Sequence, residues 1–355
     1  MASTQDTLQL FQRTEKEFPL NKVQSYQNKD LDPITRFNHQ SVLSMAHAAE
    51  SLYFDLFVRA KEEESRETFA TLGMMAHHNR CVLLAMTDPT ETPIESLYSG
   101  ELGLIYNYSN ISQVEPNTQV KTLFQYFVFD HLDHLHSLKK DFQKELGESV
   151  NTFLQDRFHL IEGRPFNQQQ LTPKDVNQGP LQNHVDAITW ANIIGMKAME
   201  RHAHSLYLNC IRSTKTPETR TKLEQFGMVE IQHAQIYGSC FKGDLNDLLR
   251  LSAFEYSKVL NLRRVIETEP CADHKATYQK MLSIAETCLQ TCNQFATSIG
   301  KQDTKSFVQS GHEKDRPTQT VDAYLNTIKD LRTKRVTPKM TISMMPEERA
   351  KTPKQ

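Results

Sequence analysis

The chain repeats itself at an offset of 154 residues, and this repeat limits the fold more than any other feature of the sequence. The matches are spread over the whole repeat: Asp32, Ile34, Thr35 and Asn38 correspond to Asp186, Ile188, Thr189 and Asn192; Ser51-Leu52-Tyr53 to Ser205-Leu206-Tyr207; Gly73-Met74 to Gly227-Met228; Glu101 to Glu255; and Glu115-Pro116 to Glu269-Pro270. We therefore interpret the chain as a tandem duplication.

Each copy is predicted to be entirely helical. Glycine is scarce (12 in 355 residues), and apolar residues recur at helical spacing throughout. Asp32-Pro33 has the form of a helix start, and Pro89, Pro93 and Glu115-Pro116 separate later helices. Four helices per copy with short connections predict an all-α protein of two tandem antiparallel four-helix bundles. The expected helices are residues 33–62, 64–86, 94–111 and 119–146 in the first copy, and 187–213, 217–242, 245–267 and 272–299 in the second.

The domain boundaries follow from the repeat. We expect an N-terminal arm (1–30), a first bundle (31–146), a linker (147–183), a second bundle (184–300) and a charged tail (301–355). The linker contains Gly163, Pro165, Pro173 and Pro180. Within the tail only residues 321–332 look helical, and the last twenty residues look disordered.

Composition excludes several classes of function. A formal charge of -2 and an isoelectric point near 6.7 give no reason to expect nucleic acid or an acidic membrane as a partner. The apolar runs, such as Val82 to Met86, are too short to span a bilayer, and residues 1–20 do not resemble a signal peptide. A soluble cytoplasmic protein is expected. The six cysteines form no Cys-x-x-Cys pair, which favours reduced thiols and argues against a rubredoxin-type iron site.

Glu230 and His233 carry the clearest chemical signal. Residues three apart on a helix share one face, so this carboxylate and imidazole project side by side, and such a pair suits iron, manganese or zinc. Glu200 lies thirty residues upstream on another predicted helix, and Glu255 lies twenty-five downstream on a third. Carboxylates recurring once per helix are typical of a carboxylate-bridged metal site.

With these residues the chain resembles the ferritin-like superfamily, and within it the rubrerythrin-type bundles that hold a di-metal centre. That resemblance implies a Glu on the first helix, Glu-x-x-His on the second, a Glu on the third and Glu-x-x-His on the fourth. The second copy matches with Glu200, Glu230, His233 and Glu255, but has Ala285 and Cys288 on its fourth helix. The first copy departs in the opposite half: Ala46 or His47, Ala76 and Asn79 replace the first three ligands, whereas Glu101 is kept and the fourth helix offers His131 and His134.

Two incomplete sites, one in each copy, are therefore expected. Glu101, His131 and His134, with His47 as a fourth donor, would suit one Fe(II), Mn(II) or Zn(II) ion. Glu200, Glu230, His233 and Glu255 would form the second site. Bridging carboxylates offset the charge of the two ions in a di-metal site. Because each copy lacks some of these ligands, we expect each bundle to bind at most one ion. In the competing interpretation the carboxylates pair with Arg201, Lys258 or Arg263, and the histidines make ordinary hydrogen bonds. Tyr53 and Tyr207 are interpreted as core residues.

Two functional hypotheses remain open at this stage. One is a redox metalloprotein, an oxidoreductase that uses non-haem iron or manganese with oxygen, peroxide or a small organic substrate. The other is a degenerate, metal-free scaffold that binds a partner protein, either alone or as a homo-oligomer. The missing ligands in both copies favour the scaffold. The complementary pattern of retention, the front half in one copy and the back half in the other, favours the metalloprotein.

Overall fold

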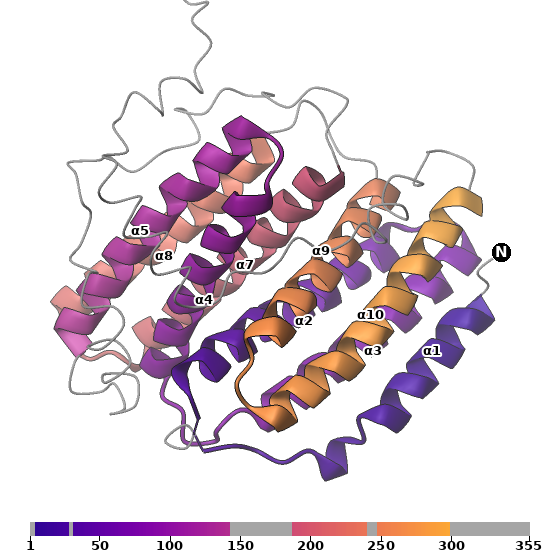
Figure 1. Ribbon diagram of the computed structural model, residues 1–355, viewed down its shortest axis with the longest axis horizontal. Helices are drawn as coiled ribbons and strands as arrows, with labels where there is room; N and C mark the ends of the chain where they lie inside the picture. Colours follow the sequence, from indigo (N-terminus) through magenta and orange to yellow (C-terminus); the bar gives the residue numbers. More distant parts are fainter. Residues whose placement is uncertain (1–3, 28–30, 143–186, 240–246, 299–355) are drawn as a thin grey trace, which may run out of the picture.

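The computed structural model describes residues 4–27, 31–142, 187–239 and 247–298, and every regular element among them is a helix (Figure 1). The all-α prediction is confirmed for this part of the chain. The elements are α1 (Thr4–Glu17), a short 3-10 helix (Leu20–Lys22), α2 (Pro33–Arg59), α3 (Glu63–Met86), α4 (Pro93–Val114), α5 (Thr118–Phe142), α7 (Ala187–Ser213), α8 (Pro217–Ser239), α9 (Asp247–Thr268) and α10 (Ala272–Ser298). The predicted linker and tail, with the helix expected at 321–332, lie outside the described residues.

Local sequence sets where these helices begin. The Asp32 carboxylate accepts a hydrogen bond from the backbone N–H of Ile34, and Pro33 takes the first helical position of α2. At α4, Thr92 and Glu95 form a reciprocal capping box around Pro93. Both devices satisfy backbone N–H groups that the first turn of a helix leaves unpaired. They fix the ends of the two helices that lie deepest in the molecule.

A central layer holds the molecule together. Helix α2 contacts α4, α7 and α9, and α7 contacts α4 and α9. The outer helices α3, α5, α8 and α10 each pack on the helix that adjoins them in sequence. Because α4 has neighbours on several sides, every residue from 97 to 112 is buried, and its polar side chains need partners inside the protein. Asn107 shows this: its Nδ2 donates to the carbonyl of Gly103 (2.8 Å) and to Ser41 Oγ (2.9 Å).

Reciprocal hydrogen bonds connect the two copies. Glu115 of the first copy accepts hydrogen bonds from Thr189 and Asn192 of the second. Their repeat counterparts do the same in reverse, because Glu269 accepts from Thr35 and Asn38. A contact that recurs with the two partners exchanged is the mark of a two-fold relation. The copies therefore pack as the two halves of a pseudo-symmetric pair.

Two close helix crossings occupy matching repeat positions, but glycine and serine are exchanged between their helices. Where α7 crosses α9, a Cβ on Gly195 would meet Ser257 Oγ at 1.8 Å, so only glycine fits there. The corresponding crossing of α2 and α4 has Ser41 and Gly103 at these repeat positions, and a Cβ on Gly103 would lie 3.1 Å from the carbonyl oxygen of Phe37. Each crossing therefore has one glycine, which lies on α7 in the first crossing and on α4 in the second.

Helix α1 is an addition to the expected fold. The N-terminal segment was expected to be an arm, yet residues 4–17 form a helix that packs on α3 and α10. Thr7, Leu10 and Thr14 are buried at helical spacing, and Phe18 follows them at the end. The segment is amphipathic, with Leu10 and Phe18 in the core and Phe11 packed against it, so the sequence carried a helical signal that the interpretation as an arm overlooked.

Candidate metal centre

Six ionisable side chains from four helices meet in the protein interior. Glu101 comes from α4, His131 and His134 from α5, Glu200 from α7, and Glu230 and His233 from α8; all six are 0% exposed. Two overlapping groups have one donor atom from each member within 4.8 Å of the others. They are Glu101, His131, His134 and Glu230, and His131, Glu200, Glu230 and His233. Glu230 and His131 belong to both groups and so lie at the centre of the cluster.

Helical spacing builds the cluster from two facing pairs. His131 and His134 lie one turn apart on α5, as Glu230 and His233 do on α8, and the two helices are in contact. His134 Nδ1 lies 3.0 Å from Glu230 Oε1, and His131 Nδ1 lies 2.9 Å from Glu101 Oε2. His233 Nδ1 lies 3.4 Å from Glu200 Oε1. These separations bring each imidazole to a carboxylate from a different helix.

An outer layer of hydrogen bonds orients the inner one. The Tyr207 hydroxyl donates to Glu101 Oε1 (2.6 Å), and the Tyr108 hydroxyl donates to Glu200 Oε1. Asp130 Oδ2 lies 3.1 Å from His233 Nε2, so this carboxylate accepts the Nε2 proton. That tautomer leaves the lone pair on His233 Nδ1, which faces the cluster. Carboxylates and hydroxyls behind the ligating atoms are typical of protein metal sites.

Several inner atoms lack a hydrogen bond within the described part of the chain. They are both oxygens of Glu230, both ring nitrogens of His134, His233 Nδ1 and Glu200 Oε2. Buried polar atoms are normally paired, since leaving one unpaired costs about 1–3 kcal/mol. So many unpaired atoms in one cluster are difficult to explain as ordinary packing. They fit a shared cation, because Glu200, Glu230, His233 Nδ1 and one ring nitrogen of His134 can each offer it a lone pair.

The pKa shifts show an excess of buried negative charge. The pKa of Glu230 is raised well above its usual range by burial and by the charges of Glu101 and Glu200. Burial alone would lower the pKa of His131, but the carboxylates of Glu200 and Glu101 raise it to about 10. Without a metal the cluster therefore takes up protons to reduce repulsion among its carboxylates. A bound cation would also reduce the repulsion among these carboxylates.

The placement of the predicted ligands differs from the expectation in two respects. Glu101, His131 and His134 of the first copy do not form a site apart from Glu200, Glu230 and His233 of the second, because the two sets meet in one cluster. The division into one site per copy thus gave the wrong grouping. It treated each copy as self-contained, whereas α4 contacts α7 and α5 contacts α8.

Glu255 and His47 do not join the cluster. Both oxygens of Glu255 accept from Lys258 Nζ (3.0 and 2.9 Å), and the Tyr53 hydroxyl also donates to this carboxylate. The competing interpretation, in which a lysine neutralises the carboxylate, thus describes Glu255. His47 lies on α2 with its ring 5.6 Å from that of His202, outside both ligand groups.

Sequence reasoning missed most of the outer layer. Asp130, Tyr108 and Tyr237 were not singled out as part of a site, and Tyr207 was interpreted as a core residue. Tyr207 is buried as expected, but its hydroxyl also supports Glu101, and its repeat counterpart Tyr53 supports Glu255 in the same way. The matched tyrosines and matched glutamates were visible in the repeat. The sequence did not show that each tyrosine pairs with the glutamate of the other copy.

Comparisons with known proteins add no assignment: no protein-family model, curated protein or solved structure matches this chain. Among the described helices none is long and apolar enough to cross a membrane. The geometry of the cluster is therefore the observation from which a function can be inferred.

Proposed function

We propose that the cluster binds two divalent transition-metal ions and that the protein is a ferritin-like redox metalloprotein. The observation that carries this proposal is the set of six buried donors, because four of them (Glu200, Glu230, His134 and His233) have atoms without a hydrogen bond in the described structure. Carboxylate and imidazole ligands without thiolates suit iron or manganese. We propose iron or manganese as the metal and oxygen, peroxide or a small organic molecule as the reactant.

The ligand roles follow from the two overlapping groups. Glu101 and His134 would hold one ion, Glu200 and His233 the other, and Glu230 would bridge them. His131 takes the place where the family resemblance implies a second bridging glutamate. Bound metal would supply electron transfer and Lewis acidity.

The protein's own residues prepare the site. Tyr207 and Tyr108 hold Glu101 and Glu200 by donated hydrogen bonds, and Asp130 keeps the proton of His233 on the nitrogen that faces away from the cluster. Rings cover the imidazoles: Phe127 stacks on His233 at 3.9 Å between centroids, and Phe226 lies 4.4 Å from His134. This shell excludes water, which strengthens each electrostatic interaction inside it.

The same proposal accounts for the complementary ligand loss. We infer two ferritin-like bundles, each made of one helix pair from either copy: α4, α5, α7 and α8 in one, and α2, α3, α9 and α10 in the other. The first bundle contains the predicted ligands that each copy retains. The second contains the positions at which ligands are missing, and there Lys258 is the cation beside Glu255.

Metal analysis tests the proposal directly. Protein purified without chelator is expected to carry about two equivalents of iron or manganese per chain, because two donor groups share one bridging carboxylate. The His131→Ala/His134→Ala double variant is expected to lose most of this metal, measured by elemental analysis of folded protein. Equal metal content in the two proteins would exclude His131 and His134 as ligands, and wild type without bound metal would favour the metal-free scaffold that binds a partner protein.

Metal binding is also expected to weaken as pH falls below about 10, because protons then compete with the metal for the imidazole of His131. The raised pKa of His131, about 10 in the metal-free cluster, means that metal binding at neutral pH must displace a proton. Calorimetric titration with Mn(II) in two buffers of different ionisation enthalpy would detect the released protons. Affinity that does not change with pH would contradict ligation by these histidines.

A further inference from the structure

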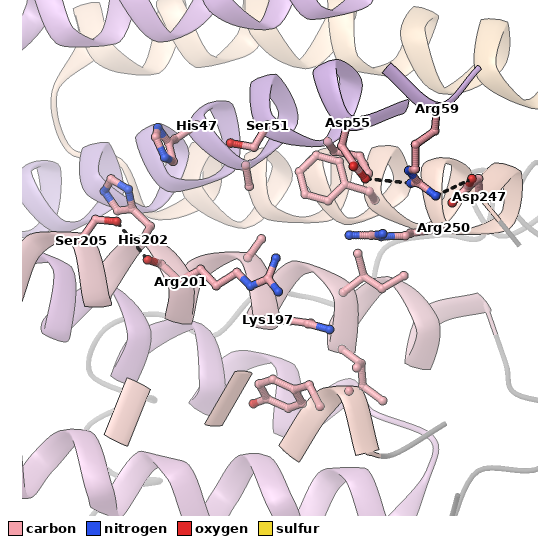
Figure 2. A pocket seen from close by; sticks show the side chains of 18 residues that line it. His47, Ser51, Asp55, Arg59, Lys197, Arg201, His202, Ser205, Asp247 and Arg250 are labelled. Atoms are coloured by element: carbon pink, nitrogen blue, oxygen red, sulfur yellow. Dashed lines mark hydrogen bonds and ion pairs between the residues drawn. The ribbon is translucent and has the colours of Figure 1, made fainter. Parts of the chain in front are cut away.

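A second polar cavity adjoins the cluster on the other face of α7. It has a volume of about 1190 Å³ and lies between α2, α7 and the start of α9, with Tyr237 and Gly238 of α8 in its wall (Figure 2). This is large enough to hold a small organic ligand. No residue of the metal cluster lines it.

Positive charge is concentrated in this cavity. Lys197 and Arg201 lie one turn apart on α7, Arg250 extends from α9, and Figure 2 shows their charged ends turned toward one another. Within the described part of the chain no carboxylate pairs with Arg201 or Arg250. Arg59, at the far end, differs because Asp55 (2.7 Å) and Asp247 (2.9 Å) neutralise it. The charge excess is therefore local.

Buried imidazole nitrogens without partners mark the part of the wall next to Arg201. Both ring nitrogens of His202 are buried and have no hydrogen-bond partner among the described residues, and His202 lines the cavity beside His47. An imidazole ring carries at least one N–H donor in either of its protonation states. A buried N–H group without an acceptor indicates a missing ligand atom.

The cavity and the cluster share a wall. Tyr237 lines the cavity, and its hydroxyl donates to that of Tyr108 (2.5 Å), which in turn donates to Glu200. Glu200 and Arg201 are adjacent on α7. The side chain of Glu200 belongs to the cluster, whereas that of Arg201 lines the cavity. A molecule in the cavity is thus separated from the cluster by one pair of tyrosines.

We propose that this cavity binds a small molecule that carries an oxyanion, either a phosphoryl or a carboxylate group, held by Lys197, Arg201 and Arg250. Guanidinium and ammonium groups are the side chains that proteins use for such anions. Binding itself requires no metal. Only the identification of the occupant as the reactant of the redox centre rests on the function proposed above.

The test is calorimetric titration of the full chain at low ionic strength, since salt screens partly exposed charges. Inorganic phosphate and succinate are the two probes, which distinguishes a phosphoryl from a carboxylate ligand. We expect saturable binding of at least one probe, and Arg201→Gln and Arg250→Gln should each raise its Kd about tenfold or more, the effect of losing a charge-assisted hydrogen bond. Arg212→Gln, an exposed arginine of α7 outside the cavity, is the matched control and should leave Kd unchanged.

Each titration is run on metal-loaded and metal-depleted protein, which separates this inference from the proposed function. Binding of equal strength in both forms supports the cavity, even in a protein that proves to bind no metal. Binding only to the metal-loaded form would place the anion on the metal and overturn the inference. Failure of the wild-type protein to bind either probe, or unchanged affinity in both cavity variants, would also overturn it.

Discussion

Replacing Glu230 with glutamine is expected to remove both metal ions and to stabilise the metal-free protein. Its carboxylate is the only one in both ligand groups, so its loss removes the proposed bridge. Without metal, however, Glu230 is a buried acid whose pKa is raised well above its usual range by burial and by Glu101 and Glu200. Keeping it buried at neutral pH therefore costs free energy, which the neutral amide avoids.

The measurement is a pair of thermal unfolding curves, with and without metal, for wild type and Glu230→Gln. Wild type should gain several degrees from metal through binding linkage, and the variant should gain almost nothing. In chelator the order should reverse, with the variant melting higher. Glu255→Gln serves as control, because that carboxylate is buried outside the cluster and its replacement should leave metal content unchanged. A Glu230→Gln protein that retains full metal content would refute the bridging role.

Removing Lys258 is expected to destabilise the protein by about 3–5 kcal/mol, the cost typical of stripping one partner from a buried ion pair. Glu255 is 0% exposed and Lys258 only 12%, and the ammonium contacts both carboxylate oxygens. Although burial alone would lower the pKa of Lys258, Glu255 raises it, so the lysine stays charged. Lys258→Met would leave the Glu255 carboxylate with the Tyr53 hydroxyl as its remaining donor among the described residues.

Chemical denaturation of Lys258→Met, Glu255→Gln and the double variant completes a cycle. The double variant should be more stable than Lys258→Met, because no charge is left buried alone. Additive losses would show that the two groups do not interact and that Lys258 does not act as the cation of this helix group. Metal content should be unaffected in all three proteins.

The sequence predicted the helices well because their ends are marked chemically. Asp32-Pro33, Thr92-Pro93 and Glu115-Pro116 combine capping groups with residues that cannot continue a helix, and the expected ends differ from the observed ones by only a few residues. The first-turn cap of α2 even uses the predicted residue. Helix α1 was missed although its sequence is amphipathic, because the N-terminal segment lies outside the repeat from which the other helices were inferred.

Which helices pack together was beyond reach of the hydrophobic pattern. A helix hairpin such as α4 and α5 buries the same apolar face whether it packs on the other hairpin of its own copy or on one from the second copy. Periodicity is identical in the two cases, so it cannot choose between them. The informative signal was chemical: Glu101, His131 and His134 complete the set that Glu200, Glu230 and His233 begin. The outer tyrosines depend on the same pairing and were unpredictable for the same reason.

The reciprocal bonds between the copies, such as Glu115 with Thr189 and Glu269 with Thr35, have a genetic consequence. Two separate chains of a single copy, packed in this way, would form a homodimer in which one gene encodes both sites. Any mutation that removed a ligand from one site would then remove it from the other. Joining the copies in one reading frame breaks this link. Ala76 and Glu230 occupy the same repeat position, so under the function proposed above the duplication allows one group of helices to differ from the other at a metal ligand.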